Sequence, residues 1–198
     1  MGNIFGSNPV TPEDKGFRQN CGDGDLEEVR RSILNQTFEE DHLATSISEA
    51  ILNFHSDIVE LLMAIPDFNV NHGPGFYEGQ RNGGGVVYSE KCFYPPPIIT
   101  ASMAGNIEAI SILTLDSRLT GLNQKLASRD FSDSDVFYYT VERNFQFYEM
   151  SPVMISVTRG DLEAVKVLVE VPGLDLDTTN DRGWTLEQVA RYMVVAWL

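Results

Sequence analysis

Cysteine and histidine are scarce in this 198-residue sequence, and each shortage excludes a class of site. Its two cysteines, Cys21 and Cys92, are too few for a disulfide framework and lack the paired spacing of a zinc or redox motif. The three histidines, His42, His55 and His72, lie far apart, so no ligand pair occurs at helical spacing. We therefore expect reduced thiols, no metal and no cofactor.

Basic residues are also in short supply. The 14 lysines and arginines are outnumbered by 29 aspartates and glutamates, which gives a formal net charge of −15. A field of this sign repels nucleic-acid phosphates and anionic lipid surfaces. The same field attracts a basic protein surface and speeds its encounter with the chain. The composition therefore argues against nucleic-acid binding and favours a protein partner, with a basic surface as one option.

Long apolar runs are absent, so no transmembrane segment is expected, and the N-terminus lacks the pattern of a secretory signal. These absences predict an intracellular, cytoplasmic protein. Residues 1–16 are expected to form a flexible tail. Gly2 is a candidate myristoylation site, but Gly6 stands where the usual signal has Ser or Thr. Peripheral membrane association through an acyl chain on Gly2 is therefore the less favoured alternative.

The clearest pattern in the sequence is a repeated segment. Pro97–Ile110 and Pro152–Val165 both begin with proline and continue with apolar residues at helical spacing. Each then has Gly, a small polar residue, an aliphatic residue and Glu, which open a second apolar helix. Partial copies occur at Gly24–Arg30 and Phe54–Leu62. Each copy predicts two helices joined by a tight turn, called the elbow below.

The segments that follow two of these helix pairs also match. Ile65–Asn71 and Val171–Asp177 agree position by position and carry alternating polar residues that favour a turn. Together, these openings, elbows and exits resemble the ankyrin repeat. The resemblance implies an all-α repeat solenoid, in which helix-turn-helix units stack over residues 17–198. The units expected from it are about 17–45, 46–72, 95–126 and 150–179, with a partial unit at 180–198.

Two elbow residues bear on this resemblance. Phe54 stands where the family has Gly, and this departure predicts a distorted turn. His55 follows it, at a position where the family commonly carries His for structural reasons. We therefore expect His55 to support the turn rather than to serve as a ligand or catalyst.

Two insertions, about 73–94 and 127–149, separate the units by more than the roughly 33 residues of an ordinary ankyrin repeat. In the first, Asn82-Gly83 lies between aromatic and β-branched runs, which is a hairpin signal. In the second, Val136–Val141 and Phe145–Tyr148 flank a polar turn. We expect two β-hairpins that project from one face and expose some of their aromatic rings. For any one ring, packing against the helices is an equally weighted alternative.

No catalytic set emerges from the sequence, so we expect a binding protein rather than an enzyme. The resemblance implies an adaptor or scaffold that binds another protein through the loop tips and the concave face of the first helices. The partner-binding residues expected on this basis are Tyr77, Tyr88, Phe93, Phe137, Tyr138, Tyr139, Phe147, Tyr148, Thr100, Met103, Thr158, Arg159, Arg182 and Trp184. The alternative is an acidic inhibitor or decoy that occupies a basic site on an enzyme or a nucleic-acid-binding protein. An enzyme built on the insertions is less favoured.

Overall fold

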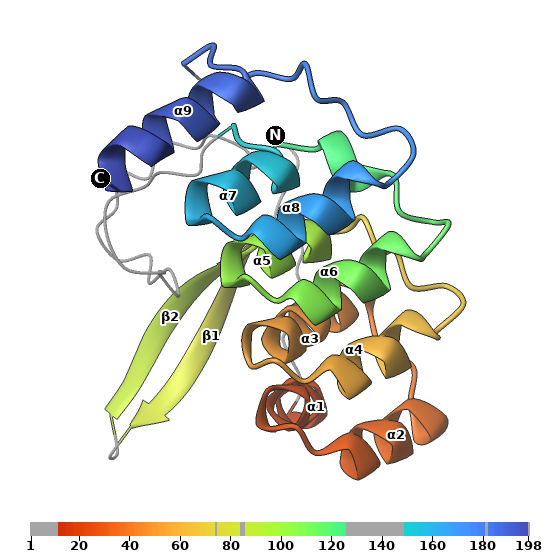
Figure 1. The fold of residues 1–198 in the computed structure, drawn as a ribbon. Helices are drawn as coiled ribbons and strands as arrows, with labels where there is room; N and C mark the ends of the chain where they lie inside the picture. Colours follow the sequence, from red (N-terminus) through yellow and green to blue (C-terminus); the bar gives the residue numbers. More distant parts are fainter. Residues whose placement is uncertain (1–11, 74, 84–85, 126–148, 181, 198) are drawn as a thin grey trace, which may run out of the picture.

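The computed structural model describes residues 12–73, 75–83, 86–125, 149–180 and 182–197 (Figure 1). Nine α-helices lie within these ranges, and the prediction of a mostly helical chain is confirmed for them. Their bounds are α1 (Pro12–Asp23), α2 (Leu26–Asn35), α3 (Glu40–Leu52), α4 (Ser56–Met63), α5 (Pro97–Ala104), α6 (Ile107–Thr114), α7 (Pro152–Arg159), α8 (Leu162–Val169) and α9 (Leu186–Trp197). A single 3₁₀ turn, η1, covers Gly121–Asn123.

The helices form two layers. The odd-numbered helices α1, α3, α5, α7 and α9 pack side by side in chain order, and α2, α4, α6 and α8 do the same in a second layer (Figure 1). Each of the first four odd-numbered helices also packs against the even-numbered helix that follows it. We call such a pair a unit, and number the units one to four from α1–α2 to α7–α8.

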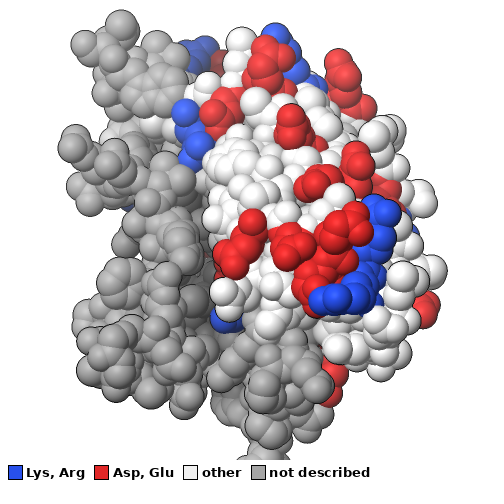
Figure 2. All heavy atoms as spheres, turned by 90° about the horizontal axis from the view of Figure 1, so that it is seen from below, with Lys and Arg blue, Asp and Glu red and all other residues white. Residues whose placement is uncertain are grey.

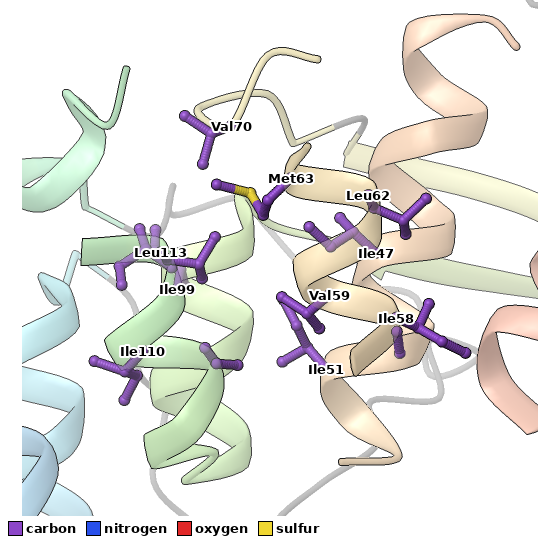
Figure 3. Close-up of a cluster of buried hydrophobic side chains, with 14 of the residues drawn as sticks. Ile47, Ile51, Ile58, Val59, Leu62, Met63, Val70, Ile99, Ile110 and Leu113 are labelled. Carbon is purple, nitrogen blue, oxygen red and sulfur yellow. The ribbon is translucent and has the colours of Figure 1, made fainter. Parts of the chain in front are cut away.

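Apolar side chains of neighbouring units hold the layers together (Figure 3). Completely buried examples from units two and three are Ile47, Ile51, Ile58, Val59, Leu62, Ile99, Ile110 and Leu113. Each such side chain stabilises the fold by roughly 1.5–3 kcal/mol through removal of apolar surface from water. Because these side chains come from both units, neither unit has a complete core without its neighbour.

The helix ends follow from local sequence. Pro97 and Pro152 stand at the first positions of α5 and α7, where a missing N–H costs nothing. Asp25 caps α2, because its carboxylate accepts a hydrogen bond from the backbone N–H of Glu28. Asn106 caps α6 in the same way through the N–H of Ala109. These four residues account for the short, well-defined units.

The four elbows share one backbone conformation. Gly24, Gly105 and Gly160 have φ values of +81°, +69° and +75°, in the left-handed region that glycine tolerates best. Phe54 has φ of +62° at the same point of unit two. The prediction of a distorted turn at Phe54 is therefore wrong: the turn keeps the shared geometry, and the phenylalanine takes the unfavourable conformation.

Two strands lie between α4 and α5. β1 (Gly75–Gly83) pairs antiparallel with β2 (Val86–Tyr94), and the ribbon leaves the helix layers on the side of the odd-numbered helices (Figure 1). β2 also contacts α3. Asn82 and Gly83 do not form the turn that the sequence predicts, because both still pair within the ribbon and Gly83 is opposite Val86. The second predicted insertion is about 127–149, and its residues 127–148 lie outside the described residues.

Two predicted boundaries need correction. α1 begins at Pro12, inside the expected tail of residues 1–16. α3 begins at Glu40, so the expected boundary between residues 45 and 46 falls within a helix. Among the described residues, no helix combines the length and the apolar character that crossing a bilayer requires.

Candidate partner-binding surfaces

The residues expected on the concave face are largely used within the fold. Thr100 and Thr158 are only 3% and 5% exposed. The hydroxyl of Thr100 donates to the carbonyl of Pro95, and that of Thr158 donates to the carbonyl of Met154. The expectation that these two residues contact a partner is therefore corrected, because their polar atoms are already bonded and covered. Met103, the third helix residue of this group, is half-buried and packs against the core.

Arg159 joins two elbows. Its Nε lies 2.6 Å from Oδ2 of Asp161, and its Nη1 donates to the carbonyl of Met103 at 2.9 Å. Nη2 donates to the carbonyl of Ala104 at 3.4 Å. The guanidinium therefore satisfies carbonyls at the end of α5 that the helix leaves unpaired. Arg159 was expected to contact a partner, and the structure gives its donors a structural role.

The same kind of bond recurs at the earlier elbows. Nε2 of His55 lies 3.1 Å from the carbonyl of Gly22, at the end of α1, and a carbonyl only accepts, so Nε2 carries the proton. Nδ2 of Asn106 donates to the carbonyl of Ile51, at the end of α3. Each unit thus caps the first helix of the unit before it. The predicted structural role of His55 is confirmed.

Arg118 makes the corresponding connection at the loop ends of the helices. Its guanidinium donates to the carbonyls of Met63, the last residue of α4, and of Ile65 and Phe68 in the loop that follows, at 2.6, 3.0 and 3.3 Å. Asp116 holds it in place, with Oδ2 2.5 Å from Nη2. Hydrogen bonds from Arg118 lower the pKa of Asp116. Sequence reasoning missed this residue, although an arginine and an aspartate two positions apart occur both here and at Arg159.

Asparagines connect successive loops. Oδ1 of Asn71 accepts from the backbone N–H groups of Thr120 and Gly121, and Oδ1 of Asn123 accepts from that of Asp175. The turns predicted from the matching exits are confirmed, because Asn69 accepts from the N–H of Asn71 and Asp175 from that of Asp177. The loop edge is therefore tied together by side chain to backbone bonds from unit to unit.

An aromatic and cationic cluster lies before and within α9. The guanidinium of Arg182 lies 5.7 Å from the ring centre of Trp184, within cation–π range. The ring of Trp184 packs 5.1 Å from that of Tyr192. Arg182 and Tyr192 are exposed, and Trp184 is half-buried. Two of the residues expected to bind a partner, Arg182 and Trp184, are thus brought together on an accessible surface.

The remaining expected contacts fall on the ribbon or outside the described residues. Tyr77 pairs with Cys92, Phe93 with Phe76, and Tyr88 with Arg81. The candidates that lie outside the described residues are Gly2, Phe137, Tyr138, Tyr139, Phe147 and Tyr148.

Sequence reasoning also missed an exposed apolar row along the elbows. Phe54, Ile107 and Leu162 are 59%, 38% and 63% exposed. All three lie in or directly after an elbow, in units two, three and four. The repeated segments contain the signal for two of them, because Ile107 and Leu162 directly follow the small polar residue of the elbow. Phe54 lies two positions earlier, where the other units have glycine.

The Cys21 thiol is buried in the helix layers. Burial raises the pKa of the Cys21 thiol to about 12, so at neutral pH it is not the thiolate that a nucleophile requires. Among the described residues, no group of three or more His, Cys, Asp or Glu side chains could hold a metal ion.

No protein-family model matches the chain, and a search of curated protein sequences gives no match.

Proposed function

We propose that the chain is a divergent ankyrin-repeat domain that binds another protein and carries out no catalysis. The observation that carries this proposal is the repeated bonding between units. Side chains of units two, three and four reach back from their elbows to the carbonyls that end α1, α3 and α5. A regular stack of this kind offers long edges for a partner, since each unit adds its own loop to the same surface.

The proposed contact surface combines the β1–β2 ribbon with the loop that precedes α9. The ribbon carries Tyr77 and Tyr88, and the loop carries Arg182 beside Trp184. Tyrosine, tryptophan and arginine supply large contact areas at a low entropic cost, which is why they dominate interface energies. Thr100 and Thr158 are not part of this proposal, because both are buried.

The test is an affinity pull-down from native cell extract with the full chain as bait. In the variant, Tyr77, Tyr88, Tyr138 and Tyr139 are replaced by Ala. We expect the retained partner to be lost while the helical circular dichroism stays unchanged, because the substitutions leave the helix layers intact. The matched control replaces Gln80 and Ser89, which pair within the same ribbon, by Ala. Equal retention by the tyrosine variant and the wild type would refute the proposed contact surface.

A second candidate function, an acidic inhibitor or decoy of a basic site, is favoured by charge. Figure 2 shows the molecule from below the view of Figure 1, and on the described part of this face red acidic side chains prevail over blue basic ones. The net charge of −15 has the same sign. Salt distinguishes the two functions: raised ionic strength should abolish the binding of a decoy and only slightly weaken an interface built on aromatic rings.

A further inference from the structure

The even-numbered layer of helices is open at its α8 end. α9 packs against α7 and so extends the odd-numbered layer, whereas no even-numbered helix follows α8 in the described part of the chain (Figure 1). Each earlier even-numbered helix has the next one beside it, because α2 packs against α4, α4 against α6 and α6 against α8. One side of α8 therefore lacks the neighbour that the stack gives to the other three.

Unit two shows what such a neighbour covers. Val59 is the fourth residue of α4, Met63 is the eighth, and Val70 lies in the loop that follows; they are 0%, 7% and 0% exposed. Figure 3 shows them on the side of unit two that faces Ile99 and Leu113 of unit three. These three positions are therefore buried by the next unit of the stack.

The equivalent positions of unit four are uncovered. Val165 and Val169 are the fourth and eighth residues of α8, and Leu176 matches Val70 in the aligned exits. Val169 and Leu176 are 43% and 47% exposed, and Val165 is half-buried. Leu162, which is 63% exposed, shares one side of α8 with the two valines, because residues three and four apart are neighbours on a helix. We call Leu162, Val165, Val169 and Leu176 the end face.

The stack indicates what kind of element fits the end face. α4, α6 and α8 are each eight residues long, about 12 Å at 1.5 Å per residue, and they pack side by side in succession. α6, which α8 covers, carries Ile107 and Ile110 where α8 carries Leu162 and Val165. The end face thus continues the interface between α6 and α8, and the apolar side of a helix of about two turns fits it.

Charge distinguishes between possible helices. Glu170, Asp175 and Asp177 are exposed at and after the C-terminal end of α8. A second copy of the chain would bring the same carboxylates and a further net charge of −15 to this end, and like charges at an interface oppose association. A basic helix is favoured instead. Its dipole places Lys or Arg best in the last turn, which meets these carboxylates when the helix runs in the direction of α8.

We propose that the end face binds an amphipathic helix of another protein, which takes the place of a fifth even-numbered helix. The apolar side of this helix covers the end face, and Lys or Arg in its last turn lie beside Glu170, Asp175 and Asp177. This site goes beyond the proposed function, because it uses α8 and the exit of unit four rather than the ribbon and the pair of Arg182 and Trp184.

The probe copies α8, since α8 already covers the preceding helix of the stack. It is a fluorescein-labelled peptide with the sequence of residues 161–171, in which Glu163→Lys and Glu170→Lys supply basic charge. A hydrocarbon staple between two exposed positions holds the helix, because helices of this length are marginal in water. Fluorescence anisotropy measures its binding to the full chain. A stapled peptide of the same composition, in which the lysines interrupt the apolar side, controls for attraction by charge alone.

We expect the probe to bind about tenfold more tightly than the control peptide, because a few buried apolar anchors dominate such contacts. The double variant Leu162→Ser with Val169→Ser should lose this advantage. A matched control, Leu34→Ser with Leu115→Ser, removes exposed leucines from units one and three and should bind the probe like the wild type. Tyr77→Ala with Tyr88→Ala should also leave probe binding unchanged, which separates this test from that of the proposed function.

Equal affinity for the two peptides would overturn the proposal, since charge alone would then explain the binding. Unchanged binding by the variant of Leu162 and Val169 would overturn it as well. Sedimentation equilibrium tests the other occupant: a wild-type dimer that this variant turns into a monomer would assign the end face to a second copy and overturn the proposal. Circular dichroism checks that the variant keeps its helices, and Leu162→Ser alone, at the most exposed of the four positions, gives a second variant.

Discussion

The elbow edge and the loop edge connect the same helices in opposite ways. The elbows are uniformly short, and all four share a left-handed residue. The connections at the loop edge range from the few residues between α2 and α3 to the long segments that follow α4 and α6. The elbow edge does not tolerate insertions, because side chains of one elbow bond to the helix end at the next. The loops can lengthen without disturbing the helices.

Both edges nevertheless use an arginine to join units. Arg159 satisfies carbonyls at the end of α5 on the elbow edge, and Arg118 satisfies those at and after the end of α4 on the loop edge. In both cases an aspartate two residues away orients the guanidinium. Arg118 donates hydrogen bonds to more carbonyls than Arg159 does. Loss of Arg118 should therefore lower the unfolding free energy more than loss of Arg159.

Arg118→Ala should have the largest effect, a loss of about 3 kcal/mol of unfolding free energy, because it leaves several partly buried carbonyls without a donor. Urea unfolding followed by circular dichroism measures it. Arg118→Lys keeps the charge but not the forked geometry and should recover less than half of the loss. If Arg159→Ala lowers the unfolding free energy more than Arg118→Ala does, the elbow edge depends more on its arginine than the loop edge, contrary to this prediction.

Gly105→Ala should cost about 2 kcal/mol, from the left-handed φ together with displacement of Arg159. A Cβ at this position would lie against the Arg159 guanidinium and 2.9 Å from Oδ2 of Asp161. The control is Gly173→Ala at the loop edge, where φ is +88° and no atom lies within 4 Å of the added Cβ. Thermal unfolding of both variants separates crowding from backbone strain; equal losses would show that the elbow is not crowded.

Phe54→Gly should have the smallest effect and the opposite sign, a gain of about 1 kcal/mol in unfolding free energy, because glycine relieves the strained φ. Phe54→Ala keeps a Cβ and should unfold at nearly the wild-type urea concentration. A destabilised Phe54→Gly protein would mean that the ring stabilises the elbow by more than the strained φ costs.

Much of the helical framework could be predicted because its signals are local. A proline at the start and a glycine at the end mark α5 and α7, and the apolar spacing between them fixes the buried face. α3 begins before the predicted boundary of its unit, because no proline or side-chain cap marks its start: the helix follows Glu39, which makes no side-chain cap. Where the helix ends carry no distinctive residue, the sequence gives only an approximate boundary.

The connections between units could not be predicted in the same way. Arg118 and its carbonyl partners are 50 to 55 residues apart, and no local pattern links them. Phe54 adopts the glycine conformation because the stack imposes one elbow geometry on every unit, which overrides the preference of the residue. The ankyrin resemblance predicts that Thr100 and Thr158 contact a partner, whereas in this chain their hydroxyls bond to nearby carbonyls.

The direction of the elbow bonds bears on synthesis by the ribosome. The carbonyl of Ile51 receives its bond from Asn106, which is 55 residues further along the chain. At the usual rate of translation, that stretch takes roughly 3–10 s to synthesise. During this interval a nascent chain exposes the unfinished end of α3, and α5 meets the same delay before Arg159 emerges. A ribosomal pause placed in this window would prolong the exposure of an incomplete stack to chaperones.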